Sequence, residues 1–482
     1  MEALSSVIGF IFSFKAYVML PAIILITALV IRMSVGSAAL SALKLGVGFA
    51  GIFIAFGFFV QQIAPAVTSM VQTRGLDFPV LDVGWPPLAA ITWASPVAPL
   101  TIVMVLALNL AMLAPNLTRT INIDIWNYWH FALIGALVQS ASGSLLLGLA
   151  ATALIALYSI LAADWSAPHV QRECGLKGIS ITTLSINGML PYAVAANRVF
   201  DMIPGVRRIG LAQHGTAEGG FGAVGGGSGA AGGGFGAAGG GFGAAGGGLS
   251  TRRFGILMEP MAVGALVGVL FGVLAAYDVK RVLELAINVA AVMFILPHCG
   301  GLIGSAMQPV SLQLKDIIQR RFPQKTVLYV GMDAGVIMKN SAVIVTGLLL
   351  MPISIGIAFV LPGNKVLPLG DLANLIAVMS VIVLVTRSNV FRSVIIGIPI
   401  VISYLLISTR LAPLYTTLSA KAGAVTAQSY AGDITAFTDG GNPVRFWFFS
   451  LFKGDVYAFA AIPVVLALMY YSWKRNRKEI EE

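Results

Sequence analysis

Three polar side chains of complementary chemistry lie close together in residues 121–131, INIDIWNYWHF: Asp124, Asn127 and His130. A carboxylate accepts hydrogen bonds, an amide both accepts and donates, an imidazole N–H donates, and aromatic rings cover C–H surfaces. This combination suits a neutral ligand with many hydroxyl groups, whereas an anionic ligand would require basic side chains. A second interpretation is open, in which the aromatic residues form an interfacial belt and Asp124 and Asn122 cap the start of a helix.

Other ionisable side chains lie within or beside apolar segments, where a charge costs about 2.5 to 3.5 kcal/mol on insertion scales. Each is a functional candidate, because that cost needs a compensating role. With one accompanying amide, they are Glu259, His298, Asp333, Asn340, Lys365 and Asp371. A purely structural interpretation is also open for two places: His298 as a packed histidine beside a Gly-Gly pair, and Lys365 with Asp371 as an ordinary turn between spans.

The sequence has no motif for covalent catalysis or for a bound cofactor. It contains no Ser-His-Asp order, no metal-ligand spacing, no Gly-Lys phosphate loop and no dinucleotide fingerprint. The net charge is +10, but the basic residues lie at the ends of apolar runs, where membrane topology explains them better than nucleic-acid binding does. We therefore expect no catalytic residue, no metal, no cofactor and no nucleic-acid partner.

The elements that must position these side chains are membrane helices. The 482 residues are 57% hydrophobic and only 10% charged, and the mean hydropathy is +0.89, whereas a soluble domain carries about 25% charge. About ten apolar runs, give or take two, are long enough to cross the bilayer. Clear examples are 16–31, 45–60, 101–114, 132–163, 261–276, 282–297, 342–361, 372–386, 394–409 and 457–472. The first run has no cleavage site and is interpreted as structural.

Basic residues predict which segments face the cytoplasm. They concentrate at 172–177, 198–253, 315–325 and 474–478, and the positive-inside rule places these segments on the cytoplasmic side. Residues 178–197 lie between two of them, so a single crossing there would break the alternation. A re-entrant hairpin that carries Asn187 resolves the conflict and indicates a permeation site. A surface amphipathic helix is the alternative.

A glycine-rich tract divides the chain into two halves. Residues 219–248 repeat glycine and alanine around phenylalanines spaced by seven, a composition that predicts a flexible linker. The halves echo each other weakly, since Asp124 and Asp333 each follow a similar stretch, and inverted repeats are typical of transporters. We expect a first membrane repeat over 1–200, a cytoplasmic linker over 201–254 and a second membrane repeat over 255–482.

Several phrases together resemble one family, the galactitol-type membrane-embedded IIC components of bacterial phosphotransferase systems, which are distantly similar to ascorbate IIC proteins. These phrases are NIDIWNYWHF, ADWSAPHVQ, FGILMEPMAVG, YVGMDAGVIM, LPGNKVLPLGDLA, TRSNVFRSVI and FTDGGNP, and they extend over nearly the whole chain. The resemblance implies an all-α integral membrane protein with ten to eleven transmembrane helices in two inverted repeats. It also implies re-entrant hairpins and an elevator-type movement of a core domain against a dimeric scaffold.

The resemblance implies a function as well: a homodimeric, multi-pass permease of the bacterial cytoplasmic membrane. It would move galactitol or a related polyol across the membrane and present it to a soluble IIB partner, which IIA supplies with phosphate. His130, Asn127, Asp124, Glu259, Asp333, Asn340 and Asn187 would then bind the substrate or support the residues that do.

This chain departs from the family pattern at two places. Thr182 and Thr183 follow GISI, where galactitol IIC proteins typically have Pro-His, and Lys339, Asn340 and Ser341 stand in place of Gly-His-Pro. Missing hydrogen-bonding partners change which substrate a site accepts. A non-phosphorylating carrier, channel or sensor from the same family is therefore the alternative function. An integral membrane enzyme would need a catalytic dyad or a metal cluster, and the sequence offers only scattered single residues.

Overall fold

The computed structural model describes residues 16–75, 78–203, 260–321, 328–333, 335, 337, 340–423 and 432–481. Glu259 and the glycine-rich tract 219–248 lie outside the described residues, and so does most of the expected linker 201–254.

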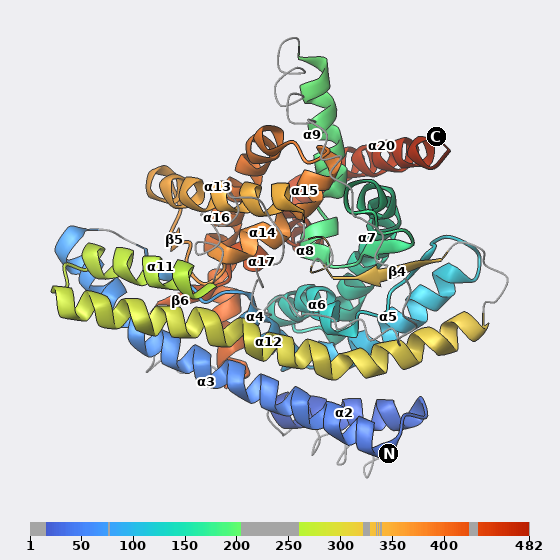
Figure 1. The fold of residues 1–482 in the computed structure, drawn as a ribbon, viewed down its shortest axis with the longest axis horizontal. Helices are drawn as coiled ribbons and strands as arrows, with labels where there is room; N and C mark the ends of the chain where they lie inside the picture. Colours follow the sequence, from blue (N-terminus) through green and yellow to red (C-terminus); the bar gives the residue numbers. More distant parts are fainter. Residues whose placement is uncertain are drawn as a thin grey trace, which may run out of the picture.

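Four helices form one edge of the molecule. These are α2 (Ala16–Val30), α3 (Val35–Arg74), α11 (Pro260–Leu274) and α12 (Val279–Arg321), and Figure 1 shows the long pair α3 and α12 running side by side. Helices of 40 and 43 residues extend about 60 Å, roughly twice the hydrocarbon thickness. Glycine allows the pair to pack closely, because a Cβ at Gly48 would come within 2.5 Å of Ile303 on α12.

The remaining elements of the first half run from β1 to α9. They are β1 (Val80–Asp82), α4 (Trp85–Trp93), α5 (Val97–Leu113), β2 (Thr120–Ile121), η1 (Ile125–Tyr128), α6 (Trp129–Ser142), α7 (Leu145–Cys174), β3 (Ile179–Ile181), α8 (Leu184–Asn187) and α9 (Leu190–Met202). Residues 178–197 thus form a strand, a four-residue helix and part of a longer helix rather than one continuous span.

The second half begins with β4 and ends near the C-terminus. Its elements after α12 are β4 (Tyr329–Met332), α13 (Ser341–Val360), β5 (Val366–Leu367), η6 (Leu372–Asn374), α14 (Leu375–Val378), α15 (Ser380–Val385), α16 (Val390–Lys421), β6 (Asp433–Thr435), α17 (Phe437–Gly440), α18 (Pro443–Phe452), α19 (Val456–Ala460) and α20 (Ile462–Glu481).

The described elements follow the same order in both halves. In each half a pair of helices precedes the first strand, which is β1 or β4, and one or two helices then lead to the second strand, β2 or β5. A 3-10 turn and further helices follow, and the third strand, β3 or β6, leads into a short helix. This order pairs β2 with β5 and therefore Asp124 with Asp371, each followed three residues later by an asparagine. The sequence echo, which pairs Asp124 with Asp333, aligns elements that do not correspond in this order.

Two small parallel sheets join the halves. The first has the order β5-β1-β6 and the second the order β2-β4-β3. In each sheet the two outer strands come from one half of the chain and the middle strand comes from the other half. Two glycines let the chain cross beside the first sheet: Gly84 has φ +80°, and a Cβ on Gly370 would come within 2.5 Å of the Gly84 nitrogen. The halves are therefore interlocked at these sheets.

Six described helices are long and apolar enough to cross a membrane, or up to seven if α4 and α5, bent by 89°, form one broken span. The membrane character predicted from the sequence is confirmed, and the ten to eleven crossings stay a prediction. The apolar run 132–163 is two helices rather than one. Gly143, with φ +74°, ends α6, and Ser144 caps α7 by accepting from the backbone N–H of Leu147.

Candidate functional site

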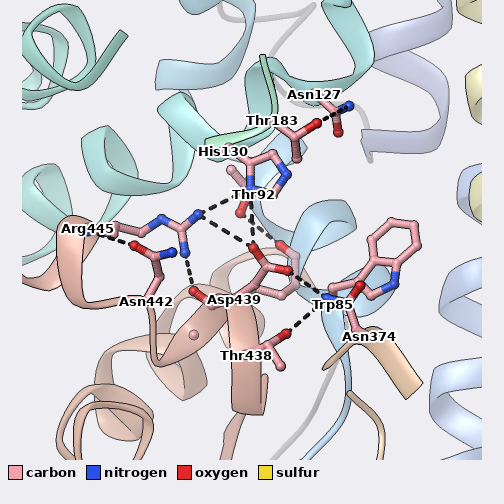
Figure 2. A network of polar contacts seen from close by, with 12 residues as sticks. Trp85, Thr92, Asn127, His130, Thr183, Asn374, Thr438, Asp439, Asn442 and Arg445 are labelled. Atoms are coloured by element: carbon pink, nitrogen blue, oxygen red, sulfur yellow. Dashed lines mark hydrogen bonds and ion pairs between the residues drawn. The ribbon is translucent and has the colours of Figure 1, made fainter. Parts of the chain in front are cut away.

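Four polar side chains meet at the carboxyl end of the β2-β4-β3 sheet, and we call them the β4 cluster: Asp124, Asn127, Thr183 and Asp333. The Asn127 amide donates to Asp124 Oδ2 at 2.7 Å and to Thr183 Oγ1 at 3.3 Å, a contact visible in Figure 2. Thr183 Oγ1 in turn donates to Asp333 Oδ1 at 2.7 Å. Both carboxylates are partly exposed. Ligands of parallel sheets bind beyond the carboxyl ends of the strands, and this cluster lies at such an edge.

A second group lies at the equivalent end of the β5-β1-β6 sheet, and we call it the β1 cluster: Asp82, Asp371, Asn374 and Thr438. Asp82 accepts four backbone N–H groups, those of Gly84, Leu369, Asp371 and Phe437, at 2.7 to 3.1 Å. Both aspartates are fully buried.

Asp371 repeats this pattern of backbone contacts. Its carboxylate accepts the backbone N–H of Trp85 at 2.6 Å, and the backbone N–H and the hydroxyl of Thr438 at 3.1 and 2.7 Å. The Asn374 amide donates to Thr438 Oγ1 at 2.9 Å and to Asp439 Oδ2 at 3.2 Å. The β1 cluster therefore fastens α4, from the first half, to turns of the second half.

Three buried side chains, which we call the buried trio, lie beside the two clusters: His130, Asp439 and Arg445. Their side chains are 3%, 2% and 1% exposed, and Figure 2 shows the Arg445 guanidinium and the Asp439 carboxylate at one edge of the His130 ring. Nδ1 of His130 lies 3.3 Å from Asp439 Oδ1 and 3.2 Å from Arg445 Nη2. On the other side, Asp333 lies near enough to His130 and to Asp124 for their charges to interact.

The sequence DGGNP, residues 439–443, explains how Arg445 reaches this place. Asn442 caps α18 by accepting from the backbone N–H of Arg445 at 3.0 Å. Pro443 occupies the first helical turn, where a backbone N–H would have no partner within the helix, so its missing N–H costs nothing. A side chain at Gly441 would overlap the carbonyl oxygen of Tyr404. The tight turn thus directs Arg445 back toward Asp439, whose backbone carbonyl accepts from Nη1.

The aromatic residues of 121–131 belong to the interior. Trp126, Tyr128 and Trp129 are 9%, 0% and 1% exposed, and Trp129 stacks on the His130 ring with centroids 3.9 Å apart. Asp124 precedes η1 without a capping hydrogen bond from its side chain. The interpretation of this stretch as an exposed aromatic belt with a helix cap is therefore wrong, because the rings pack around a buried polar site.

The structure brings four of the seven predicted site residues together, namely Asp124, Asn127, His130 and Asp333. Asn187 instead donates to the backbone carbonyls of Ser159 and Ile181, each at 2.9 Å.

Asn340 lies apart from this group, at the start of a helix. Asn340 caps α13 by accepting from the backbone N–H of Ala342, and it donates to Ser388 at 3.0 Å. Glu259 lies outside the described residues. The roles of all seven in substrate binding stay predictions.

Sequence reasoning missed several members of the site. Asp82, Asn374, Thr438, Asp439 and Arg445 were not singled out, and Asp371 was a functional candidate for which an ordinary turn stayed open as the alternative. One signal was available: DIWN at 124–127 and DLAN at 371–374 have the same Asp-x-x-Asn spacing. Within the described ranges, no three His, Cys, Asp or Glu side chains group as a metal site.

Long apolar helices, short strands at their breaks and a polar site at the junction of two halves define a multi-pass membrane permease. In such proteins, irregular backbone within the membrane is tolerated where it lines a binding site.

The sequence matches the family described as "PTS system sugar-specific permease component" over residues 10–429. It is 32% identical to the galactitol-specific EIIC component of the phosphotransferase system of Escherichia coli K12, over 99% of this chain and 98% of that protein. It is also 29% identical to a putative permease IIC component of the same strain, over 98% of this chain and 99% of that protein. The chain therefore belongs to the galactitol-type IIC components, which work in the bacterial inner membrane with IIA and IIB components.

Proposed function

We propose that this protein moves galactitol or a related polyol across the cytoplasmic membrane and presents it to a IIB partner for phosphorylation. The observation that carries the proposal is the β4 cluster with His130. Two partly exposed carboxylates, an amide and a hydroxyl lie together where strands from both halves meet. These groups accept from and donate to hydroxyls. Among the described residues of this cluster and the buried trio, the one permanent cation is Arg445, which is ion-paired and therefore does not attract an anionic sugar acid.

The substrate would bind between the two halves, which we take to be inverted repeats. The first would comprise residues 1–200 and the second 255–482, with 201–254 as a cytoplasmic linker. The shared order of elements in the described parts of both halves supports this division. The full protein would have ten to eleven crossings. The three shorter apolar helices among the described residues bring the six or seven long ones to nine or ten, which lies close to that number.

Movement would be of the elevator type. The edge formed by α2, α3, α11 and α12 would be the fixed scaffold and would form the homodimer, and the part that contains both sheets would be the moving core. A close contact between the two parts supports this division: Gly300 of α12 lies so near Trp85 of α4 that a Cβ on Gly300 would come within 2.8 Å of the Trp85 ring. Because glycine has no side chain, the face of α12 that contacts Trp85 has no projection there that would hinder movement of the core along the scaffold.

The decisive experiment is phosphoenolpyruvate-dependent phosphorylation of radiolabelled polyols. Membranes that contain the protein are mixed with the general phosphotransferase enzymes and galactitol-type IIA and IIB, and each component is omitted in turn. A labelled polyol phosphate that depends on every component supports group translocation. Binding or passive uptake without that product would overturn it and favour a non-phosphorylating carrier. The Thr182-Thr183 pair, which departs from the family pattern, motivates that second function, since Thr183 bonds Asp333 directly.

A further inference from the structure

The buried trio contains a conflict over one proton. Arg445 carries only donors, and Asp439, as a carboxylate, carries only acceptors. Nδ1 of His130 lies at nearly equal distances from the two, 3.2 Å from Arg445 Nη2 and 3.3 Å from Asp439 Oδ1. A hydrogen bond from Arg445 requires a lone pair on Nδ1, whereas a hydrogen bond to Asp439 requires a proton there. The ring cannot satisfy both neighbours at once.

The geometry decides in favour of Arg445. The Nη2–H group of Arg445 is directed at Nδ1 with acceptable hydrogen-bond geometry. The contact between Nδ1 and Asp439 Oδ1 is less well directed, because no described donor meets the distance and angle of a good hydrogen bond at that oxygen. The Asp439 carboxylate is instead held by the Asn374 amide at Oδ2 and lies 3.7 Å from Arg445 Nη2, where it balances the buried positive charge.

We propose that Arg445 is a positioning residue that fixes His130 as the neutral tautomer with its proton on Nε2. In an imidazole the two nitrogens have opposite roles when the ring is neutral, so a lone pair on Nδ1 makes Nε2 a donor. In the view of Figure 2 the Asn127–Thr183 pair lies on the opposite side of the ring from Arg445. His130 therefore directs its one N–H away from Arg445, toward the side of the ring on which Asn127 and Thr183 lie in Figure 2.

This inference rests on the proposed function for its consequence, which concerns substrate class. A site with one neutral donor and two carboxylates favours an uncharged polyol over the corresponding sugar acid, because a carboxylate on the ligand would meet Asp124 and Asp333. A cationic His130 would remove that discrimination. We expect galactonate to compete with labelled galactitol at least about tenfold more weakly than unlabelled galactitol does, because repulsion of about 1.4 kcal/mol between like charges corresponds to a factor of ten.

The tautomer is measured directly by nitrogen NMR of the full-length protein labelled with ¹⁵N-histidine in lipid nanodiscs. The chain has four histidines, and a His130→Asn variant identifies the signal. We expect an unprotonated, pyridine-type Nδ1 and a protonated Nε2 in the unaltered protein. A protonated Nδ1 would overturn the proposal, whether the ring is neutral or cationic. This measurement needs no altered Arg445, so it stands even where a variant at 445 fails to fold.

A variant tests the cause of that tautomer. In Arg445→Met the donor is gone and Asp439 becomes the polar neighbour, so the proton should move to Nδ1 and the two signals should exchange character. Arg392→Met is the matched control, because Arg392 is also buried, at 8% exposed, and pairs with Asp201 at 2.8 Å. It should leave the His130 signals unchanged. An unchanged tautomer in a folded Arg445→Met protein would show that Arg445 does not set it.

Adding galactitol separates this inference from the proposed function. A shift of the Nε2 signal with substrate supports both. The expected tautomer without any shift would uphold the role of Arg445 and overturn the placement of His130 in the substrate site.

Discussion

The β1 and β4 clusters use the same local pattern, an aspartate followed three residues later by an asparagine behind a short parallel strand, but they hold their carboxylates differently. Asp82 and Asp371 are fully buried, and backbone N–H groups supply seven hydrogen bonds to them. Asp124 and Asp333 are partly exposed and accept from the side chains of Asn127 and Thr183. Backbone donors cannot be exchanged without unfolding the turn, whereas side chains can rotate to admit a ligand.

This difference assigns separate tasks to two related sites. The β1 cluster fastens the halves together, because Asp82 of the first half accepts from Leu369, Asp371 and Phe437 of the second. The β4 cluster keeps its polar groups available at the opposite junction. His130 is in contact with Arg445 and Asp439, and Asp439 is bonded to Asn374 of the β1 cluster. The same Asp-x-x-Asn pattern thus occurs in a rigid cluster, the β1 cluster, and in an adaptable one, the β4 cluster.

The largest effect should follow from Asp82→Ala. Four buried backbone N–H groups would lose their acceptor, and each unsatisfied group costs about 1 to 3 kcal/mol, so the free energy of unfolding should fall by at least about 4 kcal/mol. Thermal unfolding in detergent measures the loss. Asp278→Ala is the control, since its side chain is 66% exposed and its loss removes a surface ion pair with Arg281 and one helix-cap hydrogen bond, together about 1 kcal/mol. Equal melting temperatures for the two variants would contradict the fastening role.

A smaller but more specific effect is expected for Asp333→Asn. The shape of the side chain is kept while its charge is lost, so galactitol affinity should fall about 10- to 100-fold, as expected for a hydrogen bond to a charged group worth about 1.5 to 3 kcal/mol. The melting temperature should change little. Isothermal titration and thermal unfolding of the same sample check both statements. A destabilised protein with intact affinity would show that Asp333 resembles Asp82.

The smallest effect should come from Thr183. Thr183→Val removes the hydroxyl that donates to Asp333 and accepts from Asn127. The hydroxyl orients these two groups, so its loss should weaken affinity only indirectly, about fivefold, which corresponds to about 1 kcal/mol. Thr183→Ser retains the hydroxyl and should bind normally. If valine and serine variants bind equally well, the hydroxyl does not organise the β4 cluster.

The membrane class and much of the β4 cluster could be predicted from the sequence. Long apolar runs leave few alternatives to membrane helices, and Asp124, Asn127 and His130 attract notice because each lies in an apolar environment. Asp333 was found for the same reason. The buried Trp126 and Trp129 could not be told from an interfacial belt, because both environments favour aromatic residues.

The β1 cluster could not be predicted, since its contacts join residues far apart in the sequence. Asp82 lies 287 positions from Leu369 and 355 from Phe437, whose N–H groups it accepts. Nothing in the local sequence indicates that β1 pairs between β5 and β6. The sequence left open whether Asp371 is functional or a turn residue, because proline and glycine surround it. Its burial depends on the crossing of Gly84 and Gly370. The strands themselves, two to four residues long, are too short for a periodic pattern.

The most direct test compares the two aspartates that occupy equivalent places, Asp124 and Asp371. Asp124→Asn and Asp371→Asn proteins are each measured for galactitol affinity by titration and for melting temperature in the same detergent. Asp124→Asn should lose at least about tenfold in affinity at an unchanged melting temperature. Asp371→Asn should lower the melting temperature, or prevent folding, with affinity retained in whatever protein folds. The same loss of affinity in both variants, without loss of stability in either, would contradict the division between a fastening cluster and a binding cluster.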